Sequence, residues 1–439
     1  MSSDLKARLM RRMQTVAKSS PNLSLAGTSN SSSNAKYERY TRVDSLPGFM
    51  EMQVQAAAAE RFGVENPYFR THEAIAGATS IIDGREVINF SSYNYLDLNG
   101  HPKVIEAATQ ALQCFGSSVS ASRVVSGERP VQRALERAIA DFHGAEDCVV
   151  MVSGHATNVT CVGHLLGKRD LLVHDSLIHN SIVQGALLSG AERISFKHND
   201  WQALDELLTA SRHRYERVLI AIEGLYSMDG DYPDLPRFVE VKRRHQAWML
   251  LDEAHSFGVM GPRGAGAIEH FGLDANDVEL HMGTLSKTLC SCGGYIAGSS
   301  ELVEYLKCSA PGFVYSVGLS PPLAAAATAA LELMALELER TEKLRENGKY
   351  FLSQAKSLGL DTGTSAGLSI VPIVCGSSLR AARLSQALLR RGVNAEPIIA
   401  PAVEERRARL RFFLSSAHGH EQIDEALQVT VEELQKVKS

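Results

Sequence analysis

The sequence predicts an α/β protein: a large domain built on a mainly parallel sheet, followed by a smaller C-terminal α/β domain. Short apolar runs alternate with helical patterns from 148 to 296, which is typical of strands joined by right-handed helical crossovers. The run WMLL at 248–251 ends directly in Asp252 and Glu253, as buried parallel strands do when their carboxyl ends carry a ligand site. An Ala/Leu-rich helical stretch at 323–346 then separates this region from a second set of strands and helices.

The composition is that of a soluble globular protein. Hydrophobic residues make up 44% and charged residues 22% of the chain, and its 439 residues suffice for two or three domains. The net charge of −5 argues against a nucleic-acid binder, and the lack of a run of about 18 apolar residues predicts no membrane span. The seven scattered cysteines lack the spacing of a zinc site, so we expect a reducing, cytoplasmic location and no metal.

The N-terminal residues differ from the rest. Residues 4–17 place apolar side chains on one face of a basic helix, and 19–35 form a Ser/Asn-rich linker that buries too little apolar surface to fold alone. Such a start suits a transit peptide, a docking helix for a partner, or a link to a carrier domain. We favour the last two, because Asp4 and the long polar linker fit a tether better than a cleaved signal.

The first globular elements are predicted from helical and hairpin patterns. Residues 53–62 have a helical pattern, and 82–90 read as a hairpin with Asp83 and Gly84 at its turn. Residues 130–143 carry apolar side chains at helical spacing, so we expect an amphipathic helix there.

The remaining elements follow from apolar runs and their connections. The large domain is expected to contain strands at 148–152, 171–173, 218–223 and 248–252, with a helix at 234–246. The small domain is expected to follow the 323–346 helix with strands at 370–374 and 409–414 and helices at 378–391 and 420–437.

A lone lysine has a specific chemical use in this context. Lys287 lies among hydroxyls and small residues in TLSK, 35 residues after Asp252. Lysine forms a Schiff base with pyridoxal phosphate, and an aspartate keeps the pyridine nitrogen of that cofactor protonated. Either residue alone is more often a surface charge or a helix cap, but their combination and order favour the cofactor.

The segments LLDEAHSFGVMG and GTLSKTLCSCGGYIAG resemble the α-oxoamine synthases, which are fold-type I pyridoxal-phosphate enzymes, and the likeness extends over roughly 65–435. The resemblance implies that Lys287 holds the cofactor as a Schiff base, that Asp252 contacts the ring nitrogen, and that His174 stacks on the ring. It further implies cofactor contacts for Gly154, His155, Ser227, His255, Thr284, Ser286 and Ser316, the last reaching a neighbouring protomer's site, and substrate contacts for Arg411 and Tyr93.

Alternatives stay open at several of these positions. Arg409 alternates with Arg411 on the predicted 409–414 strand and is the second choice for the substrate carboxylate. His155 stands where the family usually has an aromatic residue, and Asp97 where it has glycine. A zinc site that joins His174 to His179 or His155 is not expected, because the five-residue spacing of His174 and His179 does not place both on one helical face.

The resemblance implies a decarboxylative condensation of a small α-amino acid (serine, alanine or glycine) with an acyl thioester to give an α-aminoketone. The alternatives are another fold-type I reaction, such as an aminotransferase or aldolase reaction, and a non-catalytic partner subunit, against which the intact Lys287 argues. A GPRGAGA stretch lacks the GxGxxG spacing of a dinucleotide loop.

Partners and domains follow from the same reading. The segment YSVGLSPP at 315–322 resembles one that crosses a dimer interface, so we expect a homodimer. The basic start suggests an acyl carrier protein as donor, with coenzyme A thioesters as weaker substitutes. We divide the chain into a flexible extension (1–44), an N-terminal segment (45–110), a large cofactor-binding domain (111–325) and a small C-terminal domain (326–439).

Overall fold

The computed structural model describes residues 37–437, which fall into two compact units divided after Gly63. The described part of the first unit contains Arg39–Thr41 (η1), Val43–Ser45 (η2) and Pro47–Arg61 (α3). The predicted basic helix at 4–17 and the linker at 19–35 lie outside the described residues. The expected boundaries at 44, 110 and 325 stay predictions.

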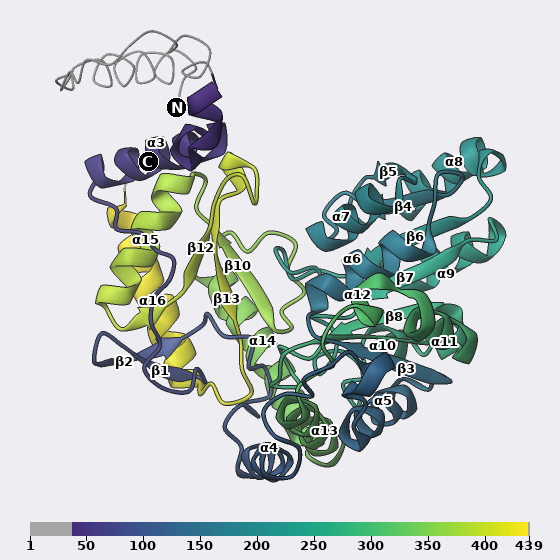
Figure 1. Cartoon of the computed structure of the whole chain (residues 1–439). Helices are drawn as coiled ribbons and strands as arrows, with labels where there is room; N and C mark the ends of the chain where they lie inside the picture. The colour runs from purple at the N-terminus through teal and green to yellow at the C-terminus, as the bar shows by residue number, and fades with distance from the viewer. Residues whose placement is uncertain (1–36, 438–439) are drawn as a thin grey trace, which may run out of the picture. The chain divides into compact units, whose positions relative to one another are not determined.

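A seven-stranded sheet forms the centre of the second unit (Figure 1). Its strands, in spatial order, are β3 (Asp147–Met151), β9 (Gly294–Gly298), β8 (Leu280–Thr284), β7 (Trp248–Asp252), β6 (Val218–Glu223), β4 (Leu171–Asp175) and β5 (Glu192–Phe196). Only β9 runs antiparallel to its two neighbours, so the expectation of a mainly parallel sheet is confirmed.

The inner strands are apolar along their whole length because both faces of the sheet are covered. Every residue of β6 is buried, and its successive residues Leu219 and Ile220 belong to two different apolar layers. Side chains alternate across a strand, so a strand between two layers needs apolar residues at every position. This is why the strands at 218–223 and 248–252 were predicted with their observed bounds.

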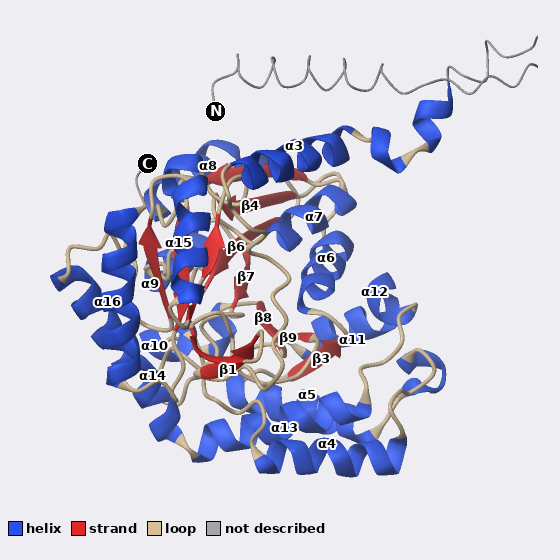
Figure 2. Cartoon of the chain, turned by 90° about the vertical axis from the view of Figure 1, so that its left-hand side faces the viewer, coloured by secondary structure: helices blue, strands red, loops and turns tan. Residues whose placement is uncertain are grey.

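Helices and turns pack around this sheet (Figure 2). The layer that contains Leu219 packs against helices that include α6 (Gly154–Leu165), α7 (Asn180–Ser189), α11 (Ser300–Ser309) and α12 (Pro311–Val314). The layer that contains Ile220 packs against α4 (Pro102–Phe115), α5 (Pro130–His143), α8 (Trp201–Ser211), α9 (Leu235–Arg244) and α10 (Ala267–Phe271). Short turns are a π-helical turn η3 (Arg123–Gly127), and the 3-10 turns η4 (Arg212–Arg214), η5 (Ala275–Asp277) and η6 (Glu405–Arg407).

Two smaller sheets complete the second unit. One has the order β10 (Ile370–Val374), β13 (Arg409–Phe413) and β12 (Glu396–Ile398), all antiparallel. The other has the order β1 (Thr79–Ile82), β2 (Arg85–Asn89) and β11 (Val393–Asn394), and its β1–β2 hairpin has the predicted turn. The predicted C-terminal helices are α15 (Ser378–Arg390) and α16 (His420–Lys436).

The single long helix predicted at 323–346 is wrong, because the structure has two helices there, α13 (Pro321–Leu336) and α14 (Leu338–Ser357). Glu337 leaves the helical region with φ −110° and ψ 62°, and the axes bend by 79°. Tertiary packing sets this break, since α13 packs on α4 and α5 while α14 packs on β10 and α16. Among the described residues no single helix is long and apolar enough to cross a membrane, and only this bent pair passes by length and composition.

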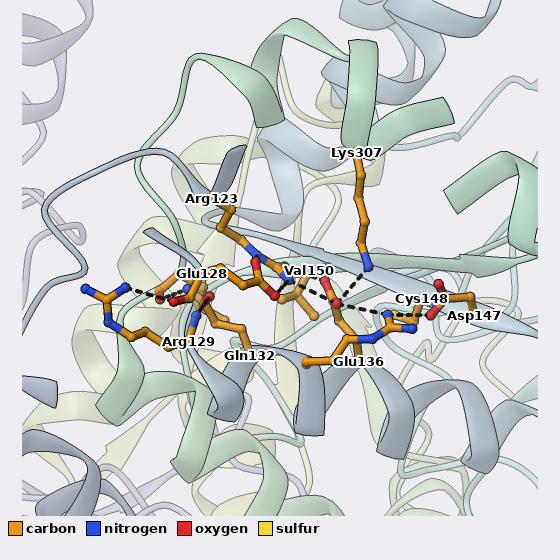
Figure 3. Close-up of polar contacts among 11 residues, drawn as sticks. Arg123, Glu128, Arg129, Gln132, Glu136, Asp147, Cys148, Val150 and Lys307 are labelled. Carbon is orange, nitrogen blue, oxygen red and sulfur yellow. Dashed lines mark hydrogen bonds and ion pairs between the residues drawn. The ribbon is translucent and has the colours of Figure 1, made fainter. Parts of the chain in front are cut away.

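A buried carboxylate, Glu136 of α5, joins several elements beneath the sheet (Figure 3). It accepts hydrogen bonds from Arg123 of η3, from Lys307 of α11 at 2.8 Å and from the Val150 amide of β3 at 3.0 Å. Arg133 lies 3.3 Å from the same carboxylate. Burial by itself would raise the pKa of Glu136. Arg123 and Lys307 together lower the pKa by a larger amount, so it lies below its usual value and the group stays charged. We call Glu136 with its three cationic partners the Glu136 cluster.

A second ionic link predicts a pH-dependent stability. The two ring nitrogens of His198 lie 2.9 Å from Asp175 Oδ1 and 3.1 Å from Asp231 Oδ2. Both partners are acceptors, so both nitrogens donate and the ring is cationic. Burial lowers its pKa, but the two carboxylates raise it to about 10.

The stabilisation by His198 is therefore complete below its usual pKa of 6.5, declines above it, and is lost as the pH rises through about 10. We expect His198→Gln to lower the melting temperature by roughly 2–5 °C at pH 6 and by much less near pH 10.5. Thermal unfolding of His213→Gln, at an exposed histidine of η4, is the matched control. A loss that does not change with pH would contradict the assignment.

Candidate active site

A pocket of about 400 Å³ lies where β6, β7 and β8 end, and Glu223, Asp252 and Thr284 from these strand ends line it. Carboxyl ends of parallel strands are the usual place for ligands in open α/β sheets. Of the residues predicted from sequence, the pocket brings together Tyr93, Gly154, His155, Ser227, Asp252, His255, Thr284, Ser286, Lys287 and Arg411. The structure does not bring His174 or Ser316 to it.

Asp252 is held as a carboxylate at the end of β7. Its Oδ2 accepts a hydrogen bond from Asn158 Nδ2 at 2.9 Å, and its Oδ1 accepts one from the Ala254 amide at 3.0 Å. The side chain is buried, with the residue 4% exposed. A buried anion of this kind suits a cationic or hydrogen-bond-donating nitrogen of a ligand.

Lys287 follows β8 in a turn in which Cys290 donates its amide to the Lys287 carbonyl at 3.0 Å. Removal from water lowers the pKa of Lys287 to about 8, although Asp252 and Glu223 act in the opposite direction. Its Nζ lies 5.7 Å from the centre of the Tyr93 ring. A lysine with this pKa is partly unprotonated near neutral pH, which is the form that reacts with a carbonyl.

His255 is neutral and fixed by Tyr95. Its Nδ1 forms a 2.7 Å hydrogen bond with the Tyr95 hydroxyl, and the residue is 7% exposed. Burial lowers the pKa of His255 well below its usual value, and nearby Lys287 and Arg411 lower it further. The bond to Tyr95 leaves the other ring nitrogen available to a ligand in the pocket.

The expected place of His174 needs correction. It lies within β4, where its Nδ1 donates to the Asp175 carbonyl at 2.6 Å and its Nε2 accepts from Arg193 at 3.2 Å. The strand runs on through Asp175, so the chain turns into the pocket only later. There His179, the N-cap of α7, lines the pocket. His179 therefore lines the pocket in the place expected for His174, together with His155 and His255.

The two strand arginines have different partners. Arg409 forms a 2.6 Å ion pair with Asp229 and is buried. Arg411 donates to the Ser227 carbonyl at 3.0 Å, and its guanidinium carbon lies 4.4 Å from the centre of the Phe413 ring. Its Nε is buried and has no partner among the described residues. Of the two arginines, only Arg411 lines the pocket.

The start of α6 is pressed closely against the end of β8. A Cβ on Gly154 would lie 2.8 Å from Thr284 Oγ1, so a larger residue would push the two elements apart. Thr284 Oγ1 in turn lies 2.8 Å from Ser286 Oγ. Amide groups at a helix start and neighbouring hydroxyls together suit an anionic group such as a phosphate.

Ser316 lies on the segment between α12 and α13, away from this pocket. The segment is held by the Gly318 amide, which donates to the Ala121 carbonyl at 3.0 Å. Its neighbour Tyr315 is 86% exposed. The expected contact of Ser316 with a neighbouring protomer's cofactor stays a prediction.

Sequence reasoning did not place Asn158 or Ser181 in the site, and it considered His179 only as a zinc ligand, although all three line the pocket. Asn158 had a detectable signal, since it lies four residues after Gly154 and so on the same face of α6. Ser181 and His179 had no comparable signal, because they lie at a helix start whose direction only the fold sets.

Comparisons with known proteins agree with this geometry. Residues 85–429 match the aminotransferase class I and II family. The chain is 40% identical to a putative 8-amino-7-oxononanoate synthase of Gloeobacter violaceus over 81% of this chain and 90% of that protein. It is 37% identical to the 8-amino-7-oxononanoate synthase of Thermoanaerobacter pseudethanolicus over 81% and 89%.

Solved structures agree as well. Serine palmitoyltransferase from Sphingomonas wittichii superposes with a TM-score of 0.85 and 29% identity, covering 90% of this chain and 99% of that one. A serine palmitoyltransferase structure that holds pyridoxal phosphate has a TM-score of 0.86 and 28% identity over the same shares. The chain belongs to the aminotransferase class I and II family and, within it, to the α-oxoamine synthase group.

Proposed function

We propose that the protein is a pyridoxal-phosphate-dependent acyltransferase. In its reaction an α-amino acid and an acyl thioester give an α-aminoketone, carbon dioxide and a free thiol. The observation that carries this proposal is the convergence of Lys287, Asp252 and Arg411 on one pocket. The relatives named as 8-amino-7-oxononanoate synthases and serine palmitoyltransferases support the same class of reaction.

The residues of the pocket fit pyridoxal phosphate. Lys287 supplies an amine for covalent attachment, Asp252 a carboxylate for the ring nitrogen, and neutral His255 a donor for the phenolic oxygen, with Ser227 beside it. The start of α6 and the hydroxyls of Thr284 and Ser286 suit the phosphate. Asn158 Oδ1 is buried in this wall without a partner among the described residues, as expected where a bound group completes the site.

The chain's own residues can then carry the reaction. Arg411, which lines the pocket, holds the carboxylate of the amino acid and orients the α carbon. Lys287 Nζ, whose pKa is about 8, moves the α proton. His179 lines the pocket beside these residues. When bound, the cofactor supplies an electron sink that stabilises negative charge at the α carbon.

Product analysis tests the proposal. Protein loaded with pyridoxal phosphate is incubated with carboxyl-labelled glycine, alanine or serine, with and without an acyl thioester. We expect labelled carbon dioxide, free thiol and an aminoketone in equal amounts, and only when the thioester is present. An aminotransferase would instead give a keto acid, and an aldolase an aldehyde, without thiol release.

The lowered pKa of Lys287 predicts the pH dependence of cofactor capture. With a pKa of about 8, roughly a tenth of the lysine is unprotonated at pH 7. We expect the rate at which cofactor-free protein captures pyridoxal phosphate to rise with pH and level off above about pH 8. The absorbance of the covalent product reports this rate, and N-acetyl-lysine under the same conditions is the control. A midpoint near the usual lysine value of 10.5 would contradict the assignment.

We further propose a homodimer with shared sites. Support comes from exposed apolar side chains on two adjoining segments, with Val125 81%, Tyr315 86% and Val317 49% exposed. Burial of such a patch against a second copy would bring Ser316 to the partner's pocket. Mixing Lys287→Ala with Ser316→Ala chains tests this, because only a shared site regains activity in the mixed dimer. A fully active monomer would rule it out.

We also propose that the acyl donor is bound to a carrier protein and that the enzyme itself is located in the cytoplasm. The basic residues behind the carrier proposal, Lys6, Arg8, Arg11 and Arg12, lie outside the described residues. Deleting residues 1–35 should raise KM for an acyl-carrier-protein thioester and leave KM for a coenzyme A thioester unchanged. Equal effects on both donors would exclude a carrier-docking role.

All seven cysteines are free, which supports the proposed cytoplasmic location, because the cytoplasm is a reducing compartment.

A further inference from the structure

Two buried polar side chains connect Asp252 to His179. Asn158 Nδ2 donates to Asp252 Oδ2 at 2.9 Å and to Ser181 Oγ at 3.0 Å. Ser181 Oγ lies 2.7 Å from His179 Nδ1. Asn158 is 1% exposed and Ser181 fully buried, so water does not compete for these bonds. The chain of bonds therefore crosses the floor of the pocket from β7 through α6 to α7.

Chemistry fixes the direction of the first two bonds. The Asp252 carboxylate already accepts the Ala254 amide through its other oxygen, so it acts as an acceptor here. Turning the Asn158 amide over would place two acceptor oxygens against each other. The Asn158 NH₂ group must therefore face Asp252, and its second hydrogen points to Ser181.

The remaining bond fixes the tautomer of His179. Ser181 Oγ accepts from Asn158, so its single hydrogen is free to be donated to His179 Nδ1. The Ser181 amide, which can only donate, also points to His179 Nδ1 at 3.4 Å. Nδ1 thus accepts from both groups, and the ring proton must lie on Nε2. Burial also lowers the pKa of His179, which keeps the ring neutral.

We propose that Asn158 and Ser181 are positioning residues that hold His179 as its Nε2–H tautomer and couple its orientation to that of Asp252. One amide then sets both the carboxylate at the strand end and the imidazole at the helix start. As a consequence, His179 always presents an N–H donor, its Nε2–H, on the side of the ring away from Ser181. Such a donor suits the carboxylate or thioester oxygen of a substrate.

The tautomer is measured directly in the full-length protein. Nitrogen-15 spectra of histidine-labelled protein distinguish protonated from unprotonated ring nitrogens, and His179→Gln identifies the signal. We expect an unprotonated Nδ1 and a protonated Nε2 at pH 7 to 8, with and without pyridoxal phosphate. A protonated Nδ1 would overturn the inference. The tautomer is read from the unsubstituted protein and needs no turnover, and His179→Gln serves only to assign the signal.

Ser181→Ala removes the hydroxyl between Asn158 and His179. We expect the His179 signals to move toward a mixture of tautomers, the affinity for pyridoxal phosphate to fall, and kcat to fall about 10-fold or more with KM changed far less. Ser189→Ala is the matched control, because this serine of the same helix α7 bonds only backbone groups, at 2.8 and 3.1 Å. Unchanged His179 signals in Ser181→Ala would contradict the proposal.

A double-mutant cycle separates a connected chain from two independent residues. If Asn158 acts on His179 through Ser181, Asn158→Ala with Ser181→Ala should lose little more in cofactor affinity than the worse single variant. Additive losses would show that the residues act separately. The kinetic part rests on the proposed function. The spectra and cofactor affinities do not, so failure of the reaction and failure of this inference remain distinguishable.

Discussion

Replacing Lys287 with alanine should abolish turnover, by about 10⁴-fold or more, because one amine serves both for covalent attachment and for proton transfer. No other lysine is placed to take over, since Lys287 is the one lysine that lines the described pocket. The variant should fold normally, as removal of a buried amine with a lowered pKa relieves a desolvation cost. Activity, visible absorbance and thermal unfolding measure the three expectations.

Borohydride reduction gives the decisive comparison for Lys287. Reduced wild-type protein should carry the cofactor on the peptide that contains residue 287, and the variant should carry none. Lys356→Ala, at an exposed lysine of α14, is the control and should behave as wild type. Cofactor trapped on another lysine of the variant would show that the attachment site is elsewhere.

Arg411→Ala should have the second largest effect, a rise of about 100-fold in KM for the amino acid, with kcat changed much less. Loss of a charge-assisted hydrogen bond to a carboxylate costs about 3 kcal/mol. Arg411→Lys should recover only part of this, because a single ammonium cannot reproduce the planar guanidinium. An unchanged KM in Arg411→Ala would move the carboxylate site to another residue.

Arg409 provides the contrast, because the two arginines lie on the same face of β13. Arg409→Ala would leave buried Asp229 without its closest partner, so we expect a loss of about 3–5 kcal/mol in unfolding free energy. Amino-acid KM in the surviving folded fraction should stay near wild type. Denaturant unfolding alongside kinetics would thus separate the structural arginine from the binding one.

The parts of the fold that the sequence predicted well are those where burial alone decides the pattern. Strands at 218–223 and 370–374 are continuous apolar runs, and both have their predicted bounds. The break at Glu337 was not predictable, because no glycine or proline marks it and the packing of two different neighbours causes it. The two residues of β11 form a strand only because distant β2 lies beside them.

The candidate site likewise contains residues that the sequence predicts and residues that it does not. Asp252 and Lys287 were predictable because a strand end and a lysine among hydroxyls have few other uses. The sequence does not show whether His174 or His179 reaches the pocket, because both follow an apolar run. Only the observed end of β4 decides between them. The preference for Arg411 over Arg409 came from the resemblance, whereas the pairing of Arg409 with Asp229 could not be predicted, because Asp229 lies on a distant loop.

The Glu136 cluster limits which segments of this protein can be exchanged for those of its relatives. Its carboxylate lies in α5, while its cations come from η3, α5 and α11, and Lys307 of α11 lies 171 positions from Glu136 in the chain. A graft that replaces the segment around Arg123 without the other segments would remove the guanidinium that bonds both oxygens of buried Glu136. Segment exchange in this region should therefore move η3, α5 and α11 as one module.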